Sequence, residues 1–174
     1  LQAVNFVETG LGINYRLQKH SRTKVDLGVG ALHLYQPKAN FYNVENKRLP
    51  LHLTFSGQGS LQLANNFDLL INGMHQLQSK YNETLVSGLL RTYVSRKRGK
   101  ELTVDLGMGY RTSGSYFPTL ALGFSNWYIS GSYDIDRTQF NQALSNNRGG
   151  PEIHLRYIHK NVRPLGTRKV CPIY

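Results

Sequence analysis

Apolar and polar residues alternate along almost the whole chain, and this period of two constrains the fold more than any other feature. The clearest segment, residues 49–63, alternates without a break over fifteen positions, with leucines and Phe55 on one face and polar residues such as Thr54 on the other. Alternation of this kind is typical of a β-strand with two different faces. No segment has a convincing period of 3.6 residues, so we predict no helix.

The pattern predicts about nine strands. They cover residues 4–17, 24–35, 49–63, 67–78, 83–95, 101–111, 116–124, 126–137 and 151–160. We expect Leu53, Leu106 and Ile129 on the apolar face. Their neighbours Thr54, Asp105 and Ser130 should lie on the opposite face.

Strand length distinguishes a membrane barrel from a soluble sandwich. Several predicted strands are 11 to 15 residues long, whereas soluble strands average about 5–6 and tilted membrane-spanning strands need about 9–11. Aromatic residues should mark the strand ends, as in an interfacial girdle; these are Tyr15, Tyr35, Tyr93, Tyr110, Trp127 and Tyr157. A soluble β-sandwich binding module, with the apolar faces packed together, is the alternative.

We therefore predict an all-β fold, an antiparallel up-and-down transmembrane β-barrel over residues 1–160, followed by a periplasmic tail at 161–174. Bacterial single-chain barrels normally have an even number of strands, so a count of nine agrees with an incomplete barrel. The first strand should then be an open edge, unpaired with the last. The chain opens at Leu1 without an initiator Met and without a signal peptide, and we expect a mature form, a fragment or an incomplete gene product.

The connections sort into two sets. The stretches 18–23, 64–66, 96–100 and 125–126 are short, whereas 36–48 and 138–150 are long. Every second connection of an antiparallel sheet lies at the same end, and in outer-membrane barrels the short turns face the periplasm. This places the C-terminus in the periplasm and the two long loops outside the cell.

Basic residues gather at the predicted periplasmic end. The net charge is +11, and 11 of the 21 Lys and Arg lie in three groups at 18–24, 96–100 and 160–174, which contain no acid. Because these groups lie mostly between strands, rather than as a stripe on one element, we expect no nucleic-acid partner. They could contact lipid phosphates of the outer membrane or dock an acidic periplasmic protein. The candidate docking residues are Arg96, Lys97, Arg98, Lys100, Lys160 and Arg163.

Motifs for catalysis or cofactors are lacking. Four Gly-x-Gly sequences lack the third glycine of a dinucleotide site, and neither the six His nor the single Cys171 has zinc-ligand spacing. Asp134 and Asp136 on one strand face are better explained as lumen charges paired across strands. We expect no enzyme, no cofactor, no metal and no small-molecule substrate.

The end of the chain resembles the PorP/SprF family. The resemblance rests on residues 127–136, which read Trp-Tyr-Ile-Ser-Gly-Ser-Tyr-Asp-Ile-Asp, and on 149–155, which read Gly-Gly-Pro-Glu-Ile-His-Leu. It implies an outer-membrane barrel of type IX secretion and gliding motility in Bacteroidetes, of which the nine strands would be the C-terminal portion. Such a barrel would support export or surface attachment of a secreted adhesin and contact periplasmic secretion proteins. The alternative from the sequence is an outer-membrane porin or transporter of hydrophobic substrates.

Overall fold

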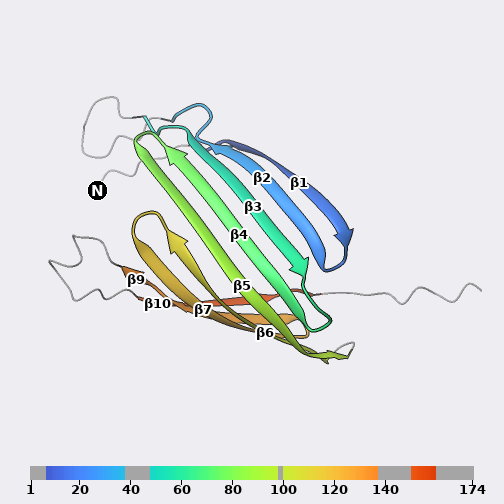
Figure 1. Ribbon diagram of the computed structural model, residues 1–174. Coiled ribbons are helices and arrows are strands. Elements are labelled where there is room, and N and C mark those ends of the chain that lie inside the picture. Colours follow the sequence, from blue (N-terminus) through green and yellow to red (C-terminus); the bar gives the residue numbers. More distant parts are fainter. Residues whose placement is uncertain (1–6, 38–47, 98–99, 137–149, 160–174) are drawn as a thin grey trace, which may run out of the picture.

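The computed structural model describes residues 7–37, 48–97, 100–136 and 150–159 as a single curved sheet (Figure 1). Its strands are β1 (Gly10–His20), β2 (Thr23–Leu32), β3 (His52–Gln62), β4 (Phe67–Gln78), β5 (Tyr81–Lys97), β6 (Lys100–Arg111), β7 (Ser115–Phe124), β8 (Trp127–Tyr133), β9 (Ile135–Asp136) and β10 (Pro151–Tyr157). No helix among these residues is long and apolar enough to span a membrane.

The sheet is antiparallel and runs up and down in sequence order. The order is β1-β2-β3-β4-β5-β6-β7-β8-β10, and the short β9 pairs with β7. Over the described residues β1 and β10 are the two edges and do not pair with each other, so the sheet is not closed. The predicted all-β, incomplete up-and-down barrel is confirmed. The alternative of a soluble β-sandwich is not confirmed, because no second sheet covers the apolar face in the described part of the chain.

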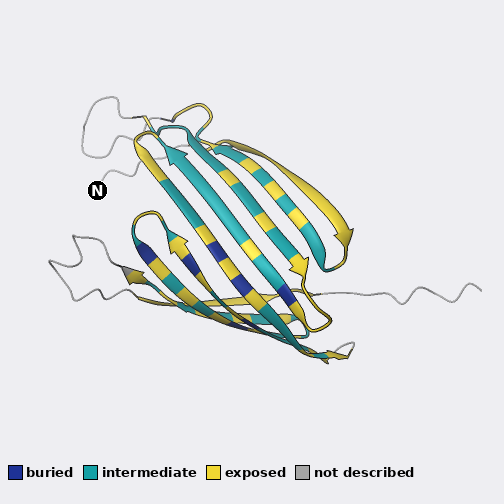
Figure 2. Cartoon of the chain, in the orientation of Figure 1, coloured by how far each residue is buried: buried dark blue, intermediate teal, exposed yellow. Residues whose placement is uncertain are grey.

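The two faces are those predicted from the alternation. Leu106 is 65% exposed while its neighbour Asp105 is 0% exposed, and along β8 the exposure alternates residue by residue, with Ile129 exposed and Ser130 half-buried. Figure 2 shows the buried positions gathered on β4 to β7. Every buried residue of the described strands lies on the polar face; these are Asp68, Ser87, Leu89, Asp105, Gly109, Ser115 and Ala121. The sheet is therefore the reverse of a soluble one, with polar groups enclosed and apolar groups outside.

Two glycines on the polar face lie where the curved sheet leaves no room for a side chain. On this face a Cβ at Gly107 would collide with the carbonyl oxygen of Gly88 and lie 2.6 Å from the Cα of Leu89, and one at Gly109 would collide with the ring of Phe117. On the apolar face, a Cβ at Gly131 would meet nothing within 4 Å. The polar face is crowded because it is concave.

The strand boundaries differ from the predicted ones by a few residues, and one predicted strand is divided. The predicted strand 126–137 is interrupted after Tyr133. The β7–β8 ladder stops at Thr119, and β7 pairs again with β9 from Tyr116. Between them lies Pro118, which has no N–H to donate to a neighbouring strand.

Three of the aromatic residues predicted to lie near strand ends do so. Tyr110 pairs with Tyr116 at one end of the sheet, with ring centroids 5.0 Å apart, and Trp127 pairs with Tyr157 at the other, at 4.7 Å. The other three are placed differently from what a girdle of strand-end aromatics requires. Tyr15 lies in the middle of β1, and Tyr35 lies beyond the end of β2. Tyr93 lies on the polar face, where its hydroxyl donates to Asp68.

Candidate functional site

The centre of the concave face is a buried ion pair. Arg91 of β5 lies directly opposite Asp105 of β6. Its Nε and Nη2 donate to the two carboxylate oxygens at 2.8 and 2.7 Å. The hydroxyl of Tyr128, from β8, donates to the same carboxylate at 2.9 Å. Arg156 of β10 stacks on Tyr128, 4.7 Å from the ring centroid. A bidentate pair with a third donor is a strong, directional contact, and here it links three strands.

A second ion pair ties two turns together. Arg22, in the β1–β2 turn, donates from Nε to Asp68 of β4 at 3.0 Å and from Nη1 to the carbonyl of Asn65 at 2.8 Å. Asp68 is 1% exposed and also accepts from Tyr93 at 2.8 Å. The hydrogen bonds to Asp68 raise the pKa of the Arg22 guanidinium above its ordinary value, so it stays charged.

This second pair corrects part of the predicted charge arrangement. The segment 18–24 contains no acid, but Asp68, from another strand, neutralises Arg22 within the sheet. Arg22 therefore does not require an external anion. Sequence spacing could not show this, because the two residues are 46 positions apart.

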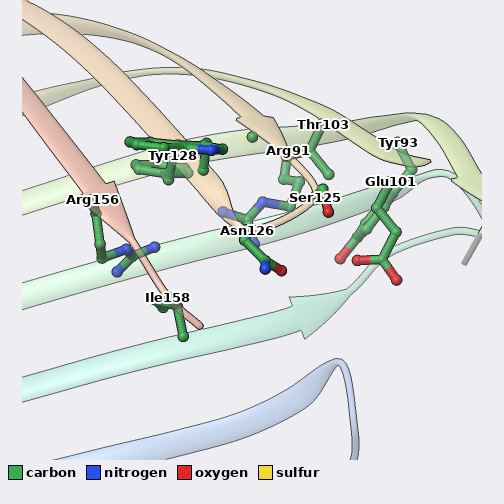
Figure 3. A pocket seen from close by; sticks show the side chains of 11 residues that line it. Arg91, Tyr93, Glu101, Thr103, Ser125, Asn126, Tyr128, Arg156 and Ile158 are labelled. Atoms are coloured by element: carbon green, nitrogen blue, oxygen red, sulfur yellow. The ribbon is translucent and has the colours of Figure 1, made fainter. Parts of the chain in front are cut away.

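The polar groups line two adjoining cavities that share Arg91, Tyr128 and Arg156. The larger, of about 380 Å³, is also lined by Arg16 and Lys24 from β1 and β2. The smaller, of about 190 Å³ (Figure 3), reaches Glu101, Thr103, Ser125 and Asn126. We call the two together the concave groove. The residues that line it belong to strands at both ends of the sheet order, β1 and β2 at one end and β8 and β10 at the other. The curvature of the sheet brings these strands to face each other.

The basic rim is the end of the sheet that carries the β5–β6 turn, and we define it by Arg96, Lys97 and Lys100. The register places the β1–β2 turn, the β5–β6 turn and the end of β10 at one end of the strands, as the parity argument predicts. The flanks of the two long loops lie at the other end, where Leu32 pairs with His52 and Tyr133 with Pro151.

The six candidate docking residues divide into two sets. Lys97 and Lys100 face each other across the hairpin, and Arg96 stacks on Tyr93 at 5.1 Å. Arg98, Lys160 and Arg163 lie outside the described residues. The structure thus brings three of the six together at one rim, and the docking role itself stays a prediction.

Sequence reasoning missed the groove residues. The sequence pattern does place Arg91, Asp105 and Tyr128 on the polar face, but it does not show that they contact one another. Their contact depends on strand register, which alternation does not fix. No group of three or more His, Cys, Asp or Glu residues suited to a metal occurs among the residues described. The arrangement holds fixed charges and hydrogen-bond donors, and so is suited to binding.

Comparison with known proteins gives one match. The family model described as type IX secretion system membrane protein PorP/SprF matches residues 2–157. Curated proteins and solved structures gave no match. The family match spans all described strands, and the all-β sheet with its apolar outer face fits an outer-membrane protein. The chain belongs to the PorP/SprF family of type IX secretion system membrane proteins.

Proposed function

We propose that this protein supports the export or surface attachment of a secreted adhesin in type IX secretion and gliding motility, through protein–protein contacts at the outer membrane. The observation that carries the proposal is the family match over residues 2–157. Family membership makes the chain a type IX secretion outer-membrane component. Its secreted cargo, its part in gliding and its contacts with partner proteins are the subject of the proposal. In this role the protein is a binding and positioning component without catalysis, in keeping with a family of secretion-system membrane proteins.

The exposed apolar face supports insertion in the outer membrane. Leu120 and Leu122 of β7 and Ile129 of β8 are about half exposed, at 53%, 49% and 49%. Exposed apolar residues of this number and continuity would aggregate in water, and in a bilayer they contact lipid. The aromatic pairs at the two ends fit the two membrane–water interfaces.

The basic rim supports contact with an acidic periplasmic protein. Lys97 and Lys100 form no ion pair with a described residue and lie at the end that the loop lengths assign to the periplasm. Two lysines that face each other across a hairpin repel, and an acidic surface would relieve this. Lipid phosphate at the membrane surface is the competing partner for the same charges.

The test is charge reversal at this rim. The triple variant Arg96→Glu, Lys97→Glu and Arg98→Glu should insert in the membrane but no longer co-purify with periplasmic secretion proteins or support adhesin export. Since Arg96 stacks on Tyr93, the variant Lys97→Glu with Lys100→Glu tests the rim without disturbing that contact. The control, Arg48→Glu with Lys80→Glu, reverses charges at the opposite end.

The outcomes separate the competing functions. Unchanged export and co-purification in both rim variants would contradict docking and leave the lipid contact. Solute conductance through the purified protein in liposomes, with export intact after gene deletion, would instead favour the porin or transporter alternative.

A further inference from the structure

The concave groove carries a surplus of positive charge on two facing walls. One wall presents Arg16, Lys24 and Asp26, and the other presents Arg91 and Arg156, around the cavity of about 380 Å³. Cavities of roughly 300–1,000 Å³ are of a size that binds ligands. The lining is basic and polar, so it does not suit an apolar ligand.

Two of these cations already have acid partners. Arg16 donates to both carboxylate oxygens of Asp26, and Arg91 does the same to Asp105. Lys24 and Arg156 form no ion pair with any described residue. The unpaired cations of the groove are therefore one on each wall, and Glu101 of the smaller cavity is an acid that also has no ion pair with a described residue.

The chain has little acid to place between them. It contains 10 Asp and Glu against 21 Lys and Arg. Of those acids, Glu45 and the side chain of Asp136 lie outside what the structure describes, and the basic segment 160–174 contains no acid. Asp26 and Asp105 pair with two of the four cations around the larger cavity, which leaves a surplus of positive charge that an anionic group could balance.

The smaller cavity extends the groove past Tyr128. Thr103, Ser125 and Asn126 line it together with Arg156 (Figure 3), and they offer both hydrogen-bond donors and acceptors. A polypeptide backbone needs both kinds of partner along its length. A single small anion would use neither the second cavity nor the cations on both walls.

We propose that the concave groove binds an acidic polypeptide segment of another protein, with its carboxylates at Lys24 and Arg156 and its backbone against Thr103, Ser125 and Asn126. This site is distinct from the basic rim, and it does not depend on the periplasmic docking proposed above. The binding should weaken as salt concentration rises, because the groove is open to solvent and its charges are screened.

The test measures the affinity of the purified full chain in detergent for a fluorescent oligoglutamate peptide, by anisotropy. Lys24→Glu with Arg156→Glu should weaken binding by about tenfold or more, as expected when two attractive contacts become repulsive. Lys24→Gln with Arg156→Gln should give a smaller loss, and because it adds no acid to the groove it serves if the reversal variant does not fold. Arg48→Glu with Lys80→Glu should bind as the parent does.

Three results would overturn the proposal. Equal affinity of the parent and both groove variants would show that the peptide binds elsewhere. Loss of binding in Lys97→Glu with Lys100→Glu, equal to that in the groove variants, would show general attraction to a basic protein. Full displacement of the peptide by inorganic phosphate at matched charge concentration would show a site for small anions.

Discussion

At the scale of the residue, the carboxylate of Asp105 is fully buried and depends on its hydrogen-bond partners to remain so. It accepts from Arg91 twice and from Tyr128 once. A charged group withdrawn from water is tolerated only when its partners replace the lost hydration. The three donors come from β5 and β8, so this one side chain holds the strands on both sides of β6 and β7 in register.

Asp105→Asn should lower the free energy of unfolding by about 3 kcal/mol, because it leaves Arg91 without its counter-charge. The double variant Arg91→Met with Asp105→Leu should recover most of the loss, since it removes both charges at similar volume. Urea unfolding in lipid vesicles measures both. Asp26→Asn, at the more exposed Arg16 pair, is the control and should cost less. Equal losses at the two pairs would contradict the role given to burial.

Gly107→Ala should destabilise the sheet by about 1–3 kcal/mol, as overpacking does, because its Cβ would collide with the backbone of Gly88 and Leu89. Gly131→Ala should be neutral, since a Cβ there meets nothing within 4 Å. The fraction of folded protein, seen as a mobility difference between heated and unheated samples in gel electrophoresis, compares the two variants. A larger effect at Gly131 would show that the concave face has been assigned to the wrong side.

At the scale of the element, each strand has a lipid-directed face and an enclosed one, and adjacent residues on one strand should respond oppositely to the same substitution. β7 offers the best pair, because Leu120 and Thr119 lie midway between Tyr116 and Phe124. Leu120 is exposed on the apolar face and Thr119 is half-buried on the polar face.

Leu120→Arg should cost about 2–4 kcal/mol of folding free energy in a bilayer, because it places a charge in hydrocarbon, whereas Thr119→Arg should cost less, because it places the charge on the polar face. Equilibrium folding into vesicles gives the two values. If Thr119→Arg is the more costly variant, the faces of β7 are reversed.

The alternation predicted the strands and their faces because it depends only on the local backbone. The contact of Arg91 with Asp105 depends on register, and that of Tyr128 with Asp105 depends on how three strands curve, so neither follows from one strand's pattern. The break in pairing near Pro118 and the inward position of Tyr93 could not be predicted for the same reason. A proline or an aromatic residue fits the alternation of a single strand, and its effect depends on the neighbouring strands. The basic rim was predictable in part, because connection parity follows from strand count alone.

At the scale of the whole molecule, the described sheet encloses its polar face but has two free edges, β1 and β10. In hydrocarbon, unpaired N–H and C=O groups along an edge cost several kcal/mol each. Further pairing must therefore cover both edges in the membrane, and the concave groove would then line the interior of a complete barrel. The proposed roles of the concave groove, the basic rim and the chain in secretion all require this orientation, with lipid on the apolar side.

Spin labels placed one at a time along β8 in lipid vesicles test that orientation most directly. Cys171 is first replaced by Ser, and a label is then attached at each position from Trp127 to Tyr133. Relaxation by lipid-soluble oxygen should peak at Trp127, Ile129, Gly131 and Tyr133, which are exposed. Relaxation by a water-soluble nickel chelate should peak at Tyr128, Ser130 and Ser132, which are half-buried on the polar face. The same alternation in the opposite phase, or equal exposure of all seven positions to the nickel chelate, would contradict a membrane-spanning sheet with its polar face inside.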